Sequence, residues 1–364
     1  MSVYSGPRTT SPASVDLLQD RVLLMATDPA EVAEIDPRHG GLVVAGAQAA
    51  GTVRSLRDAF PAMPLLIEPE SASSYQATQD NPFLLSADDG LWPLTLRDML
   101  DGQRQNGASL VVTPSGQVAA GDTPALKALI NQANQVDDPD VLTLVPVAGI
   151  WLTPTHIRHL VAILKSSVHP VLLGVVNSDA DPLSRQGALE GYARLAAEVP
   201  GLVAWRTDLS GLGALAHGAF AAVIGRRPSQ RRYARLDKGP FASNLADKSP
   251  HVLMPGLMRY SRALWMRTEW FATAPSLTCL CTHCSGRDLD RFDASTSGHA
   301  SAYLHNLAAL NHLVGECLSS VSRRQWWADQ MREAKSAHLE LGNLINRQVP
   351  EPTYLERWLA LSSV

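Results

Sequence analysis

The chain has little cysteine and little charge, and it lacks long apolar runs. Four cysteines in 364 residues are too few for a disulfide scaffold. No apolar run reaches about 18 residues, so we expect no transmembrane helix. The segment Met1–Ser14 is polar and lacks the apolar core of a signal peptide, so we expect a cytoplasmic protein.

Charged residues make up 18% of the chain and apolar residues 45%, which excludes global disorder. The length predicts two ordinary domains or one large α/β barrel with additions. Residues 1–200 hold 12 Lys and Arg against 22 Asp and Glu, a balance of −10, whereas residues 201–364 hold 19 against 13, a balance of +6. The basic half is therefore the expected docking region of a polyanionic partner.

Short apolar runs rich in Val, Ile and Leu recur along the first two thirds of the chain and are typical of buried parallel strands. The runs are Val22–Ala26, Leu42–Ala45, Pro64–Ile67, Ser109–Val112, Val141–Val145, Pro170–Val176, Leu202–Trp205 and Ala221–Ile224. Amphipathic stretches with helical spacing lie between them at Thr123–Val136, His156–Ser166 and Gln186–Val199. Eight such βα units fit a closed (β/α)₈ barrel, an α/β TIM barrel, within about 200 residues. A doubly wound open sheet is the alternative.

The pattern changes after about Ser249, where the alternation ends. Helical spacing in Leu304–Ser320, Trp326–Leu344 and Tyr354–Leu361 favours a C-terminal helical subdomain. We predict an N-terminal arm at 1–20, the barrel at 21–248, a zinc-binding subdomain at 249–320 and C-terminal helices at 321–364.

Three cysteines, Cys279, Cys281 and Cys284, form a C-x-C-x-x-C motif. Three thiolates so close together suit tetrahedral zinc, which needs one more ligand. The candidates for the fourth ligand are His283, His299, His305 and His312. His305 opens a His-Asn-Leu motif on a predicted helix, which is a rigid platform. A closed Cys₃His site is structural, because it leaves no coordination position for a substrate.

A C-x-C-x-x-C motif followed by a helix with His-Asn-Leu, after the eighth strand of a (β/α)₈ barrel, resembles the tRNA-guanine transglycosylase superfamily. The resemblance covers the zinc part by motif and the barrel by pattern only. It implies that Cys279, Cys281, Cys284 and His305 bind a structural zinc ion. It also implies a nucleic-acid partner, tRNA or DNA, and a possible homodimer.

The family's chemistry implies two carboxylates: one attacks C1′ of the ribose and expels guanine, and the other handles a proton. Glu68 stands near the place of the family's Asp-Ser-Gly-Gly run, without the glycines. No Asp stands after the eighth strand, where the family carries its nucleophile. If that carboxylate has moved, Asp208 at the end of the seventh strand is the best candidate. The alternatives are a helix cap for Asp208 and solvated loop acids for Glu68 and Glu70.

Several further residues are predicted to bind the substrate. Arg206 can keep Asp208 ionised, Glu70 lies beside Glu68 in sequence, and Ser115 can bond the edge of a deazaguanine-like base. A run of cations follows the eighth strand, opposed only by Asp237, and can bind phosphates. The run comprises Arg226, Arg227, Arg231, Arg232, Arg235 and Lys238.

The resemblance implies two possible functions, and the residue patterns alone allow a third. The first is a base-exchange enzyme that replaces guanine in tRNA or DNA by a 7-deazaguanine. The second is a catalytically inactive zinc-containing subunit that binds nucleic acid or a partner chain, because the usual nucleophile is absent. The third is a metal-stabilised barrel whose arginines bind a phosphate group of a small molecule.

Overall fold

The computed structural model describes residues 17–25, 32–85, 94–177, 181–238 and 247–362. These residues form two compact units. One comprises the described residues of 1–27 and 37–241, and the other those of 28–36 and 242–364.

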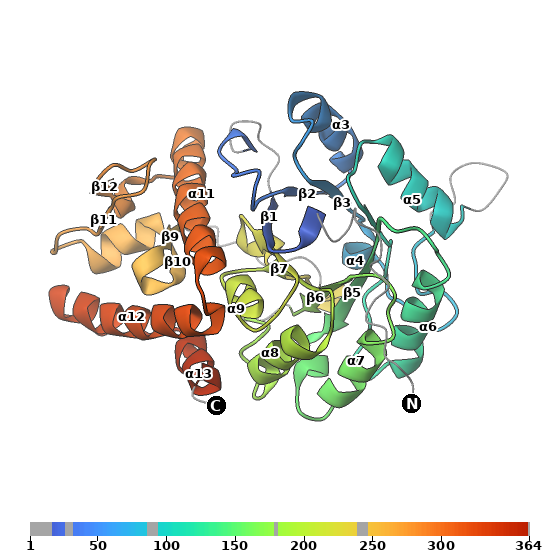
Figure 1. Ribbon diagram of the computed structural model, residues 1–364. Coiled ribbons are helices and arrows are strands. Elements are labelled where there is room, and N and C mark those ends of the chain that lie inside the picture. The colour runs from blue at the N-terminus through green and yellow to red at the C-terminus, as the bar shows by residue number, and fades with distance from the viewer. Residues whose placement is uncertain (1–16, 26–31, 86–93, 178–180, 239–246, 363–364) are drawn as a thin grey trace. The chain divides into compact units, whose positions relative to one another are not determined.

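The first unit is built on an eight-stranded parallel sheet (Figure 1). The strands are β1 (Arg21–Met25), β2 (Leu42–Ala45), β3 (Leu65–Glu68), β4 (Val111–Val112), β5 (Val141–Ala148), β6 (Val171–Val176), β7 (Leu202–Thr207) and β8 (Ala221–Gly225). Their order is β3-β2-β1-β8-β7-β6-β5-β4, which is the chain order read around a circle. The first and last strands pair over five residues, from Arg21–Ala221 to Met25–Gly225.

The remaining gap lies between β3 and β4. There the Ser109 amide donates to the Leu65 carbonyl at 2.7 Å, and the Ser109 hydroxyl accepts from the Leu65 amide at 3.1 Å. The sheet is therefore a nearly closed TIM barrel, which confirms the predicted fold class and excludes the open sheet. The predicted first strand ended at Ala26, which lies outside the described residues.

Helices cover the outside of the strands (Figure 1). They are α3 (Ala49–Ala59), α5 (Leu96–Gln105), α6 (Thr123–Ala133), α7 (Ile157–Leu164), α8 (Ala188–Glu198) and α9 (Ser210–Ala216), whereas the short helix α4 (Ser71–Ser74) places Ala72 in the core cluster. In α6 the Asp122 carboxylate caps the Ala125 amide at 3.0 Å, and Leu126, Leu129 and Ile130 are buried. A cap followed by apolar residues three and four positions apart explains why this sequence folds as a helix.

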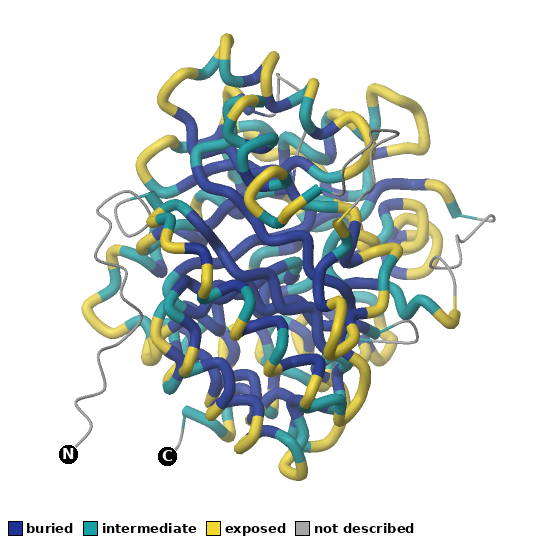
Figure 2. The backbone as a smooth tube through the Cα atoms, turned by 90° about the vertical axis from the view of Figure 1, so that its right-hand side faces the viewer, coloured by how far each residue is buried: buried dark blue, intermediate teal, exposed yellow. Residues whose placement is uncertain are grey.

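The core of the first unit lies inside the barrel, where alternate residues of each strand meet. Figure 2 shows the buried backbone, in dark blue, running along these strands. The cluster includes Leu23, Leu66, Leu144, Leu172 and Val203, all essentially inaccessible to solvent. Around Glu68 and Trp205, polar side chains replace the apolar ones that fill the rest of the barrel interior.

The second unit combines two short hairpins with three long helices. Its elements are β9 (His251–Met254), β10 (Arg259–Arg262), α10 (Ala263–Trp265), a π-helical turn (Met266–Trp270), β11 (Thr278–Cys279), β12 (Arg287–Asp288), α11 (Thr296–Ser319), α12 (Arg323–Leu344) and α13 (Thr353–Ser362). Helix α11 begins earlier than the apolar spacing predicts, because the Ser295 hydroxyl caps the Gly298 amide at 3.0 Å. Among the described helices, none is both long and apolar enough to cross a membrane.

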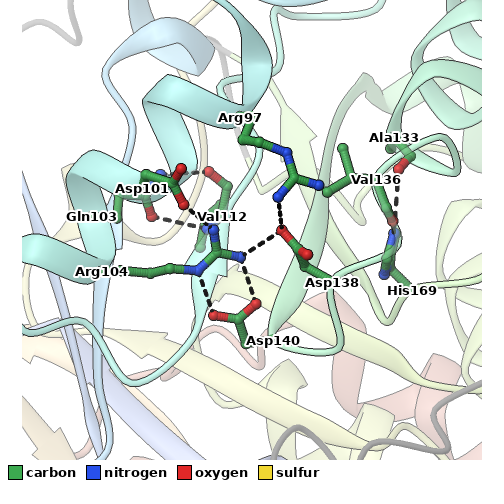
Figure 3. Close-up of polar contacts among 10 residues, drawn as sticks. All are labelled: Arg97, Asp101, Gln103, Arg104, Val112, Ala133, Val136, Asp138, Asp140 and His169. Atoms are coloured by element: carbon green, nitrogen blue, oxygen red, sulfur yellow. Dashed lines mark hydrogen bonds and ion pairs between the residues drawn. The ribbon is translucent and has the colours of Figure 1, made fainter.

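Charged residues fasten α5 to the segment that enters β5 (Figure 3). Arg104 forms ion pairs with Asp140 at 2.6 Å and with Asp138 at 3.1 Å, and a further contact with Asp101. Nearby, the His169 Nε2 donates to the carbonyl oxygens of Val136 at 2.9 Å and Ala133 at 3.2 Å. These contacts lie before β5 and β6, at the amino-terminal end of the barrel, where side chains serve stability rather than catalysis.

We expect the barrel to lose stability as the pH falls below about 6.5. Burial lowers the pKa of His169, while its bonds to Val136 and Ala133 act the other way. The unfolded chain therefore binds the proton more readily than the folded chain. The contribution of His169 is complete above the unfolded pKa and is lost as the pH falls through the lower, folded value.

Calorimetric melting between pH 7.5 and 5 measures this effect. His169→Gln keeps a donor for the carbonyls but removes the titration. Its free energy of unfolding should therefore fall less steeply with decreasing pH than that of the wild type, and the two slopes should differ by up to about 1.4 kcal/mol per pH unit. His159→Gln, on the exposed side of α7, is the matched control. Equal slopes for His169→Gln and the wild type would contradict the assignment.

Candidate metal centre and barrel mouth

The cysteine motif lies on a tight hairpin. Strands β11 and β12 pair antiparallel, with Cys279 opposite Arg287. The turn between them needs left-handed backbone, with φ of +51° at Ser285 and +87° at Gly286. Two backbone amides point at sulfur atoms: Cys281 N to Cys279 Sγ and Cys284 N to Cys281 Sγ, both at 3.4 Å.

His305 on α11 completes the cluster, as predicted. Its Nδ1 lies 3.1 Å from Cys284 Sγ and 3.5 Å from Cys281 Sγ. Its Nε2 lies 2.7 Å from the Leu253 carbonyl oxygen, so the proton is assigned to Nε2 and the lone pair of Nδ1 faces the sulfurs. Burial lowers the pKa of His305 to about 4, which keeps the imidazole neutral and able to coordinate.

The four donor atoms fit one metal ion. They lie within 4.8 Å of one another, and tetrahedral zinc would place such atoms roughly 3.5–3.8 Å apart. Burial raises the pKa of Cys279 to about 12 and also raises that of Cys284, so the thiols need a cation to exist as thiolates. The group can therefore hold a metal ion, and its four protein ligands leave no position for a substrate.

The other candidate ligands have different partners. His283 Nε2 bonds the Ser301 hydroxyl at 2.9 Å, and His299 Nε2 bonds the Lys248 carbonyl at 2.9 Å. His312 pairs with Glu316 one turn along α11. Among the described residues, the metal-binding geometry selects His305.

Asn306 has a role that the sequence analysis missed. Its Oδ1 accepts from the Leu253 amide at 2.6 Å, and its Nδ2 donates to the His251 carbonyl at 2.8 Å. His305 and Asn306 therefore bond the same strand, β9, from successive helix positions. Asparagine directly after a metal-binding histidine was the available signal.

In the barrel, the Glu68 carboxylate is fully engaged. Its side chain is 1% exposed. Arg206 donates from Nε to Oε1 at 2.8 Å and from Nη2 to Oε2 at 2.6 Å. The Trp205 indole donates to Oε1 at 2.9 Å, and the Tyr233 hydroxyl donates to the same oxygen. Arg206 thus pairs with Glu68 rather than with Asp208, the partner expected from the sequence.

A bulge in β7 makes this arrangement possible. Neighbouring residues of a regular strand point to opposite faces, yet Trp205 and Arg206 both reach Glu68. The register of β7 against β8 shifts between Ala204 and Thr207, and Arg206 adopts a left-handed φ of +53°. Such a bulge re-aims a side chain, here toward the carboxylate.

Asp208 lies half-buried directly after β7. Its Oδ1 accepts from the Ser210 amide at 2.9 Å, which satisfies the first amide of α9 from one residue before the N-cap position, Leu209. Burial first, and then the charge of Asp208, raise the pKa of Tyr192. The charge of Asp208 therefore acts on the buried phenol of Tyr192.

The remaining predicted residues are spread around the barrel. Glu70 is exposed. Ser115 is fully buried and shares a hydrogen bond of 2.9 Å with the Thr113 hydroxyl. Arg231 donates to the carbonyls of Gly225 at 3.0 Å and Arg226 at 3.2 Å, and Arg227 is exposed.

A cavity of about 530 Å³ opens at the carboxyl ends of the strands. Its lining comes from the segments after β3, β4, β5, β6 and β8, which is where TIM-barrel sites lie. The lining residues are Gln76, Gln117, Val118, Ala119, Ala120, Ala148, Gly149, Ile150, Val176, Asn177, Arg185, Arg235, Leu236 and Asp237. Glutamine, asparagine and arginine suit a polar ligand. Of these polar lining residues, only Arg235 was predicted from the sequence to bind a ligand.

No family model and no curated protein matches the chain. Among solved structures, a xylose isomerase-like TIM barrel/4-hydroxyphenylpyruvate dioxygenase fusion protein is 12% identical with a TM-score of 0.33; the match covers 63% of this chain and 40% of that one. The carboxyl transferase domain from Rhizobium etli pyruvate carboxylase is 9% identical with a TM-score of 0.38; the match covers 98% of this chain and 62% of that one. Such remote likenesses carry no functional argument.

Removing one sulfur ligand should empty the metal centre. We expect purified Cys279→Ser to hold less than about half an equivalent of metal and its C-terminal unit to melt earlier, because structural zinc contributes roughly 10–16 kcal/mol to folding in small zinc peptides. Metal content by mass spectrometry and melting by circular dichroism measure both. Cys317→Ala, a buried cysteine outside the cluster, should keep the metal. Unchanged metal in Cys279→Ser would refute the site.

Removing the Glu68 carboxylate should destabilise the barrel strongly. Glu68→Ala leaves the Arg206 guanidinium, 11% exposed, without its carboxylate, which typically costs about 3–5 kcal/mol. Urea unfolding followed by tryptophan fluorescence measures the loss. Glu70→Ala, two residues away and exposed, should change stability by less than about 0.5 kcal/mol. Similar losses of unfolding free energy in the two variants would show that the buried Glu68–Arg206 pair is not needed for the stability of the barrel.

Proposed function

We propose that the chain is a tRNA-guanine-transglycosylase-like protein that exchanges guanine for a 7-deazaguanine in tRNA or DNA. The observation that carries the proposal is the Cys₃His cluster closed by the histidine of a His-Asn-Leu motif, in a chain that also forms a TIM barrel. The resemblance to the tRNA-guanine transglycosylase superfamily depends on having both the Cys₃His cluster and the barrel in one chain. A thiolate-rich, four-ligand set favours zinc, and a closed set gives the zinc a structural role.

Asp208 is the proposed nucleophile. It follows β7 at the carboxyl end of the barrel, where the Ser210 amide donates to its Oδ1. A carboxylate oxygen of Asp208 would bond C1′ of the ribose while the bond from C1′ to guanine breaks, and guanine would leave with that electron pair and take up a proton. The incoming deazaguanine would then lose a proton, bond C1′ and release the carboxylate.

Glu68 does not fit the role of proton carrier. Arg206, Trp205 and Tyr233 already donate to both of its oxygens. It is better described as the residue that fixes Arg206 and Trp205 at the barrel mouth. Of the two catalytic carboxylates expected from the sequence, Glu68 and Asp208, the proposal therefore keeps only Asp208.

The cavity at the mouth suits the exchanging base. Gln76, Gln117 and Asn177 line it, and a carboxamide can donate to or accept from a base edge. Gln117 donates to the carbonyls of Ala72 and Ala234, so its role toward a base is that of an acceptor. The arginines that follow β8 suit the phosphates of the polymer.

A second candidate is a subunit that binds nucleic acid without catalysis. The locked state of Glu68 and the capping contact of Asp208 favour it, because both carboxylates then have structural roles. A homodimer stays a prediction under either function.

Base exchange is tested with radiolabelled guanine. We expect the wild type to incorporate the label into tRNA or duplex DNA, and to form an adduct that survives a denaturing gel. Asp208→Asn keeps the capping oxygen but loses the nucleophile, so incorporation should fall at least about 10³-fold. Asp122→Asn, the matched change at the cap of α6, should retain activity.

Other outcomes separate the alternatives. Tight, steeply salt-dependent binding without incorporation would support the non-catalytic subunit. No binding to tRNA or DNA at about 0.1 M salt would contradict both functions.

A further inference from the structure

After β8 the chain turns back and enters the barrel mouth. Tyr233 forms a parallel bridge with Val176 of β6: its amide donates to the Val175 carbonyl at 3.1 Å, and its carbonyl accepts from the Asn177 amide at 2.9 Å. The Gln117 side chain donates to the Ala234 carbonyl at 2.7 Å. Residues 231–235, named the mouth strap here, therefore lie along the carboxyl end of β6.

The Tyr233 ring closes the barrel axis. It is 1% exposed and fills the space above Gly174, where a Cβ would lie only 2.5 Å from Tyr233 Cε2. A glycine inside a strand commonly marks the close approach of another group. The Arg206 guanidinium covers the ring at 4.5 Å, and the hydroxyl donates to Glu68.

The preceding residue is half-buried. Burial lowers the pKa of Arg232, while the charges of Asp181 and Asp208 oppose that effect and the charge of Arg231 adds to it. Of the two carboxylates that the sequence marks as catalytic, Glu68 is the one that the strap contacts directly, through the Tyr233 hydroxyl.

Release of the strap leaves Glu68 paired. Without Tyr233, Glu68 still accepts two bonds from Arg206 and one from Trp205. The Tyr233 hydroxyl and the freed backbone groups return to water, which replaces their bonds. The strap also carries Arg231, Arg232 and Arg235. Arg235 pairs with the exposed Asp237, and a chain of phosphates competes for such a cation.

We propose that the mouth strap is an autoinhibitory element, which the phosphate backbone of a nucleic acid withdraws by pairing with the strap arginines. Withdrawal opens a flat slot above Gly174, bounded by Trp205 and Arg206, and removes the Tyr233 bond to Glu68. The slot suits a planar aromatic group with a hydrogen-bond donor at its edge, since the Tyr233 phenol occupies it in this way. The proposal rests on the proposed function only for the identity of the polyanion.

Hydrogen–deuterium exchange of the full-length, metal-loaded protein tests the strap. The reporters are peptides that contain the amides of Tyr233 and Asn177, which close the bridge, and the reference is the β5–β6 ladder. Adding tRNA should speed exchange of the Asn177 amide by about tenfold or more, without changing the reference. Heparin, a polyanion without bases, should do the same. If tRNA opened the strap and heparin did not, the proposal that the charge of the phosphate backbone withdraws the strap would be overturned.

Two variants sharpen the test, and the first of them needs no ligand. Gly174→Ala should push the ring out and speed exchange at Tyr233 and Asn177 without a polyanion. Gly149→Ala is the matched control, because a Cβ there meets only ordinary contacts, at 3.6 Å or more. Tyr233→Phe keeps the ring but removes the bond to Glu68, and should open at lower tRNA concentration even if Gly174→Ala fails to fold.

Protection of Asn177 that stays unchanged with tRNA and heparin, in both the wild type and Tyr233→Phe, would make the strap a permanent plug and overturn the proposal. The readout is separate from catalysis. A strap that opens in a protein without guanine incorporation leaves the inference standing and removes only the proposed base exchange.

Discussion

A buried carboxylate governs the barrel mouth. Glu68 is nearly inaccessible to solvent, and a buried charge persists only when an opposite charge and further donors satisfy it. That requirement explains the bulge in β7, the left-handed backbone of Arg206 and the glycine at position 174. Each of these features would destabilise an ordinary strand, and here each brings a donor to Glu68 or makes room for one.

The metal centre likewise depends on hydrogen bonds that hold its key side chain in place. Three thiols and an imidazole converge only because the Leu253 carbonyl holds the far nitrogen of His305. Asn306 secures the Leu253 amide, so the strand that orients the ligand is itself fixed from the same helix turn. The motif His-Asn-Leu is thus one ligand and one support for that ligand, with Leu307 buried beside them.

Several sequence predictions were close to the structure, and the differences have local reasons. The strand expected at Val141–Val145 continues to Ala148, past Pro146, because the Pro146 carbonyl still accepts from the Val118 amide at 2.8 Å. Proline lacks only a donor, so it need not end a strand. The strand expected at Ser109–Val112 shortens to Val111–Val112, because Ser109 instead closes the barrel against Leu65.

The sequence by itself determined the βα alternation and the cluster of three cysteines, because these depend on short-range periodicity and on motif spacing. Only the tertiary structure decided that the sheet closes and that His305, among four candidate histidines, joins the cysteines. Only the tertiary structure decided what Glu68 and Arg206 do. They stand 138 positions apart in the chain, and no local pattern says that a bulge will aim one at the other. The same holds for Tyr233, which appears in sequence as one aromatic residue among arginines. Its burial over Gly174 depends on how β6, β7 and the segment after β8 meet at one end of the barrel.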